Sequence, residues 1–191
     1  VRIGAMGLGY GLPMTPKASH IIERAALKRG LDAVRDRDPV VFDVGANKGD
    51  YVALILEAAG DRPVVIHAFE PDTTVADGLR GRFPSVPSFT VVTKGLSDKV
   101  GELEFTRYSQ NTLSSFHMDD DMPGSGRKDL GREVVRIPLT TIDAYCHEHA
   151  VARIDFLKID TEGHDLFVLR GASGMLAERR IERIQFEFSP M

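Results

Sequence analysis

The sequence predicts an α/β protein in which a mostly parallel sheet is covered by helices on both faces. Apolar runs that suit buried strands begin near positions 40, 64, 89, 154 and 184, and helical patterns separate most of them. The first run leads directly into a glycine turn and then a helix, as at the start of a βαβ unit. We therefore expect the strand order 3-2-1-4-5, with a ligand bound outside the carboxyl ends of the strands, between strands one and four.

Composition indicates one globular domain that acts on small molecules. The chain has 191 residues, of which 42% are hydrophobic and 27% charged, enough for a sizeable core. Its net charge is −4 and its pI is near 5.9, without a basic patch. This balance argues against nucleic acid as a partner.

Cysteine usage and hydropathy predict a cytoplasmic protein with no membrane span. Cys146 is the single cysteine, so an internal disulfide is excluded, which suits a reducing compartment. No apolar run approaches the roughly 20 residues that a membrane span needs, and no signal peptide is evident. The chain begins at Val1 rather than at a methionine, which leaves room for an upstream segment.

Residues 1–39 are predicted to form an N-terminal arm and a helix that precede the main domain, residues 40–191. The opening is rich in glycine, but it lacks a full strand before the glycines and a helix directly after them. We interpret it as a mobile arm or lid rather than a phosphate loop. Ser19 can cap a helix over 20–29, and Gly30 is a plausible end for it.

The turn after the first strand, in VVFDVGANKGDY, is the first candidate site. Asp43 ends the strand, and glycines at 45 and 49 frame the turn before a helix that starts near Tyr51. Such a turn leaves backbone N–H groups free at the helix start and admits a ligand close to the backbone. The alternative is a tight strand-to-helix connection without a ligand.

The second strand, residues 64–69, ends in Glu70, Pro71 and Asp72. Glu70 lies about 20 residues beyond the turn, the spacing at which a βαβ unit returns an acid to a ribose. Its carboxylate can accept from both vicinal hydroxyls. The alternative is an acid that stabilises the N-terminus of the next helix, predicted over 73–81.

The third strand, residues 89–92, leads to a polar turn with a second set of candidates. Asp98 could accept from an exocyclic amine and Ser97 could bond to a ring edge, although both residues also favour ordinary turns. Residues 101–108 alternate as a short antiparallel strand, and 109–133 form a long polar segment that we expect to cover the substrate. The acidic run at 119–121 reads as solvated rather than as a cation site.

The remaining elements complete the sheet. Residues 134–139 are extended, Thr140 or Thr141 can cap a helix over 142–149, and the fourth strand covers 154–160. A short helix over 166–169 and a fifth strand over 184–188 follow. The fifth strand would be an unpaired edge, so we expect a partner chain, as in a homodimer, or residues missing from this sequence to cover it.

The ordered motifs FDVGANKGDY, HAFEPD, KGLSD, SSF, IPLTTID and FLKIDTEGHDLFVLRGA resemble the FkbM-type methyltransferases, a branch of the class I S-adenosylmethionine-dependent methyltransferases. The resemblance covers most of residues 40–188. It implies a Rossmann-like three-layer sandwich, from which the usual C-terminal strands are missing after Phe188. The cofactor-binding residues that we predict from the resemblance and the turns are Asp43, Gly45, Ala46, Asn47, Gly49, Glu70, Pro71, Ser97 and Asp98.

The turn itself favours S-adenosylmethionine over a dinucleotide. A pyrophosphate needs closely spaced glycines, whereas this turn offers Gly45 and Gly49 with Asp43 just before them. Asp43 would repel a phosphate but could attract the ammonium or sulfonium group of S-adenosylmethionine. An NAD(P)-dependent Rossmann oxidoreductase and a noncatalytic nucleotide-binding module are the alternatives.

The segment LKIDTEGHD carries the predicted chemistry, O-methylation of a hydroxyl on a small molecule, sugar or glycolipid. Asp160 ends a central strand, and Glu162 and His164 follow in the same turn. One of these three residues could act as the general base. Alternatively, Asp160 and Glu162 could hold a divalent cation that lowers the pKa of the acceptor. A purely structural interpretation is that Glu162 and Asp165 stabilise the next helix while Lys158 pairs with a neighbouring acid.

Overall fold

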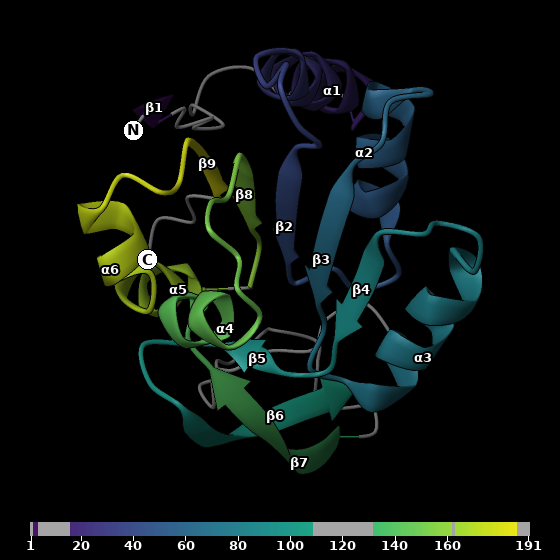
Figure 1. The fold of residues 1–191 in the computed structure, drawn as a ribbon. Helices are drawn as coiled ribbons and strands as arrows, with labels where there is room; N and C mark the ends of the chain where they lie inside the picture. The colour runs from purple at the N-terminus through teal and green to yellow at the C-terminus, as the bar shows by residue number, and fades with distance from the viewer. Residues whose placement is uncertain (1, 4–15, 109–131, 162, 187–191) are drawn as a thin grey trace.

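The computed structural model describes residues 2–3, 16–108, 132–161 and 163–186. A six-stranded, wholly parallel sheet runs through its centre, with helices on both faces, and a three-stranded sheet lies beyond the carboxyl ends of the central strands (Figure 1). The strands of the main sheet are β1 (Arg2–Ile3), β2 (Val40–Val44), β3 (Val65–Phe69), β4 (Phe89–Val92), β8 (Phe156–Ile159) and β9 (Arg183–Phe186).

The order of this sheet, β1-β9-β8-β2-β3-β4, confirms the predicted order 3-2-1-4-5 over the five strands that the sequence indicated. β2 lies at the centre, with Val44 opposite Phe69 of β3 and opposite Ile159 of β8. The chain leaves β2 toward one side of the sheet and returns through β8 on the other. The carboxyl ends of β2 and β8 therefore form the switch point at which open α/β sheets bind ligands.

Two separate apolar cores explain the three layers. Alternate residues of a strand point to opposite faces, so Val41 packs beneath α1 and α2 while Phe42 packs beneath α4. Both side chains are fully buried. The helices are α1 (Pro16–Asp32), α2 (Asp50–Ala59), α3 (Thr73–Arg82), α4 (Ile142–Glu148), α5 (Asp165–Arg170) and α6 (Ser173–Ala177).

The predicted limits of the first helix were wrong. α1 begins at Pro16 rather than after Ser19 and continues through Gly30 to Asp32. Gly30 serves close packing, because a Cβ at this position would lie 3.0 Å from the ring of Phe156. A glycine that looked like a helix end is therefore the place where the helix contacts β8.

The predicted open edge at the fifth strand is also corrected. β1 pairs in parallel with β9, Arg2 opposite Arg183 and Ile3 opposite Ile184. The start of the segment that we interpreted as a mobile arm therefore protects this edge, which removes the argument for a partner chain over these two positions. A homodimer remains a prediction, and the glycine-rich residues 4–15 lie outside the described part of the chain.

The second sheet has the order β5-β7-β6 and was only partly predicted. β6 (Gly101–Tyr108) confirms the expected antiparallel strand and β7 (Arg132–Thr140) the expected extended segment, but their pairing with each other and the short β5 (Gly95–Leu96), parallel to β7, were not predicted. Thr141 caps α4 through a hydrogen bond from Ala144 N, as one of the two predicted caps. The predicted substrate cover lies outside the described residues, apart from its last two positions, which belong to β7.

No helix in the described ranges is long and apolar enough to cross a membrane.

A partly buried ion pair anchors the amino ends of the central strands. Asp155, with 1% of its side chain exposed, accepts two hydrogen bonds of 2.7 Å from the guanidinium of Arg37. The same carboxylate accepts a hydrogen bond of 2.8 Å from the N–H of Val40. One side chain thus fixes the start of β2 against the start of β8.

We predict that Asp155→Ala lowers the free energy of unfolding by about 3 kcal/mol, because it leaves Arg37 and the Val40 N–H without their acceptor. Urea denaturation followed by circular dichroism measures this loss. Asp77→Ala is the matched control, since its pair with Arg80 is exposed and should change stability by no more than about 0.5 kcal/mol. Equal losses in the two variants would contradict the anchoring role.

Candidate functional site

The carboxyl ends of β2, β3 and β8 meet at the predicted site. Gly45 N and Ala46 N both donate to Phe69 O at 3.0 Å, and Asp160 N donates to Val44 O at 3.0 Å. These bonds tie the turn after β2 to both neighbouring strands. Asp43, Glu70 and Asp160 consequently lie along one edge of the sheet, as the strand order predicted.

Both glycines of the turn have a positive φ, and at Gly45 close backbone packing adds a second constraint. Gly45 has a φ of 77°, and a Cβ there would lie 1.9 Å from the carbonyl oxygen of Asp160. Gly49 has a φ of 84°, and a Cβ there would lie 2.4 Å from Leu79 on α3. The two positions thus need glycine with or without a ligand.

The turn also uses backbone donors that we expected to be free. Besides the two N–H groups that bind Phe69, Asn47 N donates to Glu70 Oε2 at 2.9 Å and Gly49 N donates to Ala46 O at 2.8 Å. Asn47 adopts the left-handed conformation, with a φ of 48°. The expectation of free N–H groups is therefore wrong for these four donors, which stabilise the turn itself.

Glu70 links the loops that follow β2 and β3. Its Oε2 accepts from Asn47 N and its Oε1 accepts from Asp72 N, both at 2.9 Å. Only 7% of the residue is exposed. Burial raises the pKa of Glu70 to about 7, although the two N–H donors oppose the rise. Pro71 is buried beside it, and Asp72 caps α3 through Thr74 N and Val75 N.

Lys158 joins two of the predicted acids into a charge cluster. Its Nζ lies 3.2 Å from Asp43 Oδ1 and 3.3 Å from Asp160 Oδ2. The Asp43 side chain is fully buried and that of Lys158 is 9% exposed, whereas 42% of the Asp160 side chain is exposed. The cluster therefore runs from the interior of the sheet to its surface.

The charge states of the cluster follow from its geometry. Burial raises the pKa of the Asp43 carboxyl, and the ammonium of Lys158 limits this rise. The two carboxylates raise the pKa of Lys158 despite its burial, so the lysine is protonated at neutral pH. Neither oxygen of Asp43 makes a hydrogen bond of good geometry with the described residues. We infer from these contacts that Asp43 is held as an ion pair.

An aromatic ring and a backbone carbonyl also lie near the ammonium, which donates to Gly45 O at 3.4 Å. Lys158 Nζ lies 5.3 Å from the centre of the Tyr51 ring, and Tyr51 donates its hydroxyl to Gln185 Oε1 at 2.9 Å. Lys158 is the site residue that sequence reasoning missed, since we considered it only as a structural partner. The sequence signal was a lysine within the otherwise apolar strand FLKI, whereas its pairing in register with Asp43 is seen only in the tertiary structure.

Ser97 and Asp98, the predicted adenine contacts, lie beside His164, one of the three predicted catalytic residues. His164 Nε2 lies 3.0 Å from Ser97 Oγ, which in turn lies 3.3 Å from Asp98 Oδ1. Both His164 and Ser97 are buried, and the His164 ring stacks on Phe167 at 4.6 Å. His164 thus connects the start of α5 to the loop after β5, a contact that the sequence did not predict.

Glu162 lies outside the described residues, and the residues on either side of it, Thr161 and Asp165, are joined by hydrogen bonds. Asp165 Oδ1 accepts from both Thr161 N, at 3.0 Å, and Thr161 Oγ1, at 2.5 Å. No group of three or more histidine, cysteine or acidic side chains that could hold a metal occurs among the described residues. The proposed cation pair, Asp160 and Glu162, remains an untested prediction.

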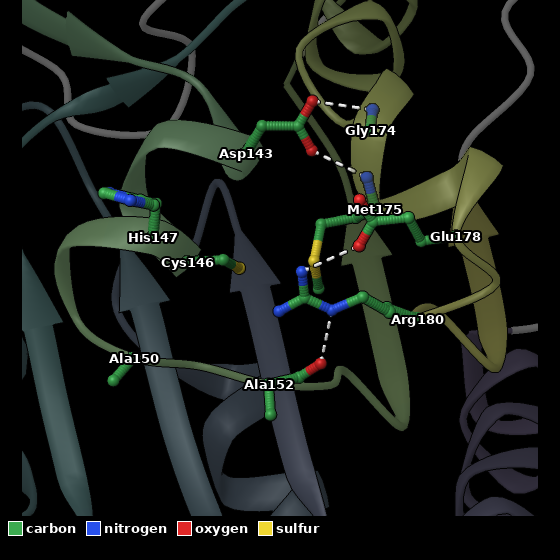
Figure 2. Close-up of a pocket in the computed structure, with 9 residues that line it drawn as sticks. All are labelled: Asp143, Cys146, His147, Ala150, Ala152, Gly174, Met175, Glu178 and Arg180. Atoms are coloured by element: carbon green, nitrogen blue, oxygen red, sulfur yellow. Dashed lines mark hydrogen bonds and ion pairs between the residues drawn. The ribbon is translucent and has the colours of Figure 1, made fainter.

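A separate cavity of about 470 Å³ lies between α4 and α6, away from these carboxyl ends (Figure 2). Its polar groups are used by the fold: Asp143 accepts from Gly174 N and Met175 N, and Arg180 donates to Ala152 O and Glu178. Figure 2 shows these contacts between residues that line the cavity. We therefore place the functional site at the carboxyl ends rather than in this cavity.

We predict that Glu70 makes stability fall as pH rises. Its folded pKa, about 7, lies above the ordinary 4.5, so the folded state binds the proton more tightly and loses stability between these two values. Between pH 5 and pH 7.5, the unfolding free energy of the wild type should fall by roughly 2 kcal/mol more than that of Glu70→Gln. Urea denaturation across this range tests the prediction, and parallel curves would contradict it.

Known proteins resemble this chain in sequence and, more weakly, in structure. Residues 43–190 match the family model of the methyltransferase FkbM domain. The chain is 25% identical over 177 residues to the hexuronic acid methyltransferase AglP of Haloferax volcanii, covering 88% of this chain and 67% of that protein. A crystal structure of methyltransferase FkbM from Methylobacillus flagellatus KT has a TM-score of 0.46 and 19% identity over 76% of this chain. This chain spans about a third of that one, 34%.

Proposed function

The chain belongs to the FkbM methyltransferase family, and from that premise we propose that it transfers a methyl group from S-adenosylmethionine to a hydroxyl oxygen of a sugar, glycolipid or other small molecule. The observation that carries this proposal is the partly buried Asp43–Lys158–Asp160 cluster beside Glu70 at the switch point of the sheet. Family membership argues against the oxidoreductase alternative.

The residues at this edge fit S-adenosylmethionine. The cluster holds two carboxylates against one ammonium, so its excess negative charge suits a sulfonium or ammonium group better than a phosphate. Glu70 can use the remaining lone pairs of its carboxyl oxygens to accept from the ribose hydroxyls. Ser97 and Asp98, on the loop after β5, are the proposed contacts to adenine.

When bound, S-adenosylmethionine supplies an activated methyl carbon, whose bond to sulfur breaks as its bond to the acceptor oxygen forms. The hydroxyl proton of the acceptor would then have to pass to a base supplied by the protein. The protein's task is to position the acceptor oxygen and to take this proton.

We assign the role of general base to Asp160. Its carboxylate is 42% exposed, while contact with Lys158 fixes one of its oxygens. His164, by contrast, is buried and its Nε2 is paired with the hydroxyl of Ser97, which suits a positioning residue. The divalent-cation mechanism with Asp160 and Glu162 is the alternative.

The acceptor that we favour is a sugar with a free hydroxyl group. The support is the similarity to AglP, which is described as a hexuronic acid methyltransferase and of which this chain covers 67%.

We predict that the wild type binds S-adenosylhomocysteine and that Glu70→Ala weakens this binding roughly 30-fold, about 2 kcal/mol, through loss of the carboxyl acceptor. Isothermal titration calorimetry measures the affinity. Glu57→Ala, an exposed acid of α2 paired with Arg24, is the control and should bind as the wild type does. Binding of NAD without binding of S-adenosylhomocysteine would contradict the proposal.

We further predict that Asp160→Asn lowers turnover about 10²-fold or more, because the amide cannot accept the proton. Its affinity for S-adenosylhomocysteine should stay within about threefold of the wild type, since that ligand is neutral at sulfur. The assay is methyl transfer to a panel of hexuronic acids, other sugars, glycolipids and polyketides. Near-normal turnover of Asp160→Asn would refute the assignment, and loss of wild-type activity with EDTA would select the metal mechanism.

A further inference from the structure

The charges of the Asp43–Lys158–Asp160 cluster do not cancel. Two carboxylates flank one ammonium, at 3.2 Å and 3.3 Å, so the cluster carries a net charge of −1. Asp43 is fully buried and Lys158 nearly so. Charges in such a place are poorly screened by water and salt, and they act strongly on a ligand at the same edge.

We propose that the Asp43–Lys158–Asp160 cluster determines cofactor specificity: its net charge of −1 makes the site prefer cationic S-adenosylmethionine to neutral S-adenosylhomocysteine, and Lys158 limits the charge to this value. The inference rests on the proposed function. Without the lysine, two carboxylates would share the site and one of them would be buried without a counter-charge. With it, the cluster and one sulfonium sum to zero.

This arrangement has a consequence for turnover. The sulfonium charge disappears when the methyl group leaves, so the attraction between the cluster and the cofactor is lost with it. The spent cofactor is then held by its adenosine and amino-acid parts alone. The charge cluster thus favours exchange of product for fresh methyl donor.

The test compares the two ligands on variants that change the cluster charge stepwise. S-Adenosylmethionine and S-adenosylhomocysteine share every group except the methyl group and its charge, so the ratio of their affinities isolates the sulfonium. Asp43→Asn brings the cluster to zero, and Asp43→Asn combined with Lys158→Met returns it to −1. Calorimetry at pH 7.5 gives both affinities for each protein.

We expect Asp43→Asn to reduce the preference for S-adenosylmethionine roughly tenfold, equivalent to about 1.4 kcal/mol for one unit of charge. The double variant should recover the wild-type preference to within about twofold. Recovery of a ligand preference by deleting a buried lysine is not a result that a purely structural role would produce.

Two further variants complete the test. Asp160→Asn makes the same change of charge at the exposed end of the cluster and serves in place of Asp43→Asn if that protein does not fold, as judged by circular dichroism. Asp61→Asn removes an exposed acid ahead of β3, at the opposite end of the sheet, and should leave the preference unchanged.

The outcomes separate the two proposals. If Asp43→Asn and Asp160→Asn bind S-adenosylhomocysteine but keep the wild-type preference, the role of the cluster charge is overturned while the cofactor assignment stands. A double variant that folds but does not recover the preference also overturns it. If the wild type binds neither ligand, the proposed function fails and the inference fails with it.

Discussion

The ion pair between Lys158 and Asp43 is the interaction on which the site depends, because it joins the two central strands at the edge where a ligand would bind. An isolated charge in the interior of a sheet costs several kcal/mol, so each of these residues requires the other. Asp160 extends the pair to the surface, where its carboxylate is 42% exposed. The two carboxylates thus leave one negative charge uncompensated by Lys158 at the switch point of the sheet.

The turn after β2 is a structural joint as well as a candidate binding loop. Gly45 lets the backbone of Asp160 approach, and the N–H groups of Gly45 and Ala46 bind the end of β3. Glu70, which follows β3, binds the same turn by accepting a hydrogen bond from Asn47 N. A substitution in this turn would therefore alter fold and binding together, so the pH dependence of stability and the ratio of ligand affinities are more informative measurements than activity alone.

The small sheet shapes the other end of the site. β5 ends at Leu96, so the next residue, Ser97, is placed by the pairing of β5 with β7, whose last residue lies more than 40 positions along the chain. His164 then contacts Ser97 from the start of α5, and Gly171 allows the backbone of Ser97 to lie against that helix. Any nucleotide contact made by this loop would thus be coupled to the segment that carries Asp160.

The sequence by itself determined the central architecture, because the patterns that encode it are local. Buried parallel strands are continuous apolar runs and the turn after β2 has a glycine signature, so the strand order and the meeting of Asp43, Glu70 and Asp160 could be predicted. Only the tertiary structure showed what depends on contacts between distant residues. It paired Lys158 with Asp43, brought His164 to Ser97, placed β1 on the edge of β9 and used Gly30 for packing rather than as a helix end. The physical reason is that an ion pair, a buried hydrogen bond or a close approach is set by the three-dimensional register of strands and helices, on which local sequence patterns carry no information.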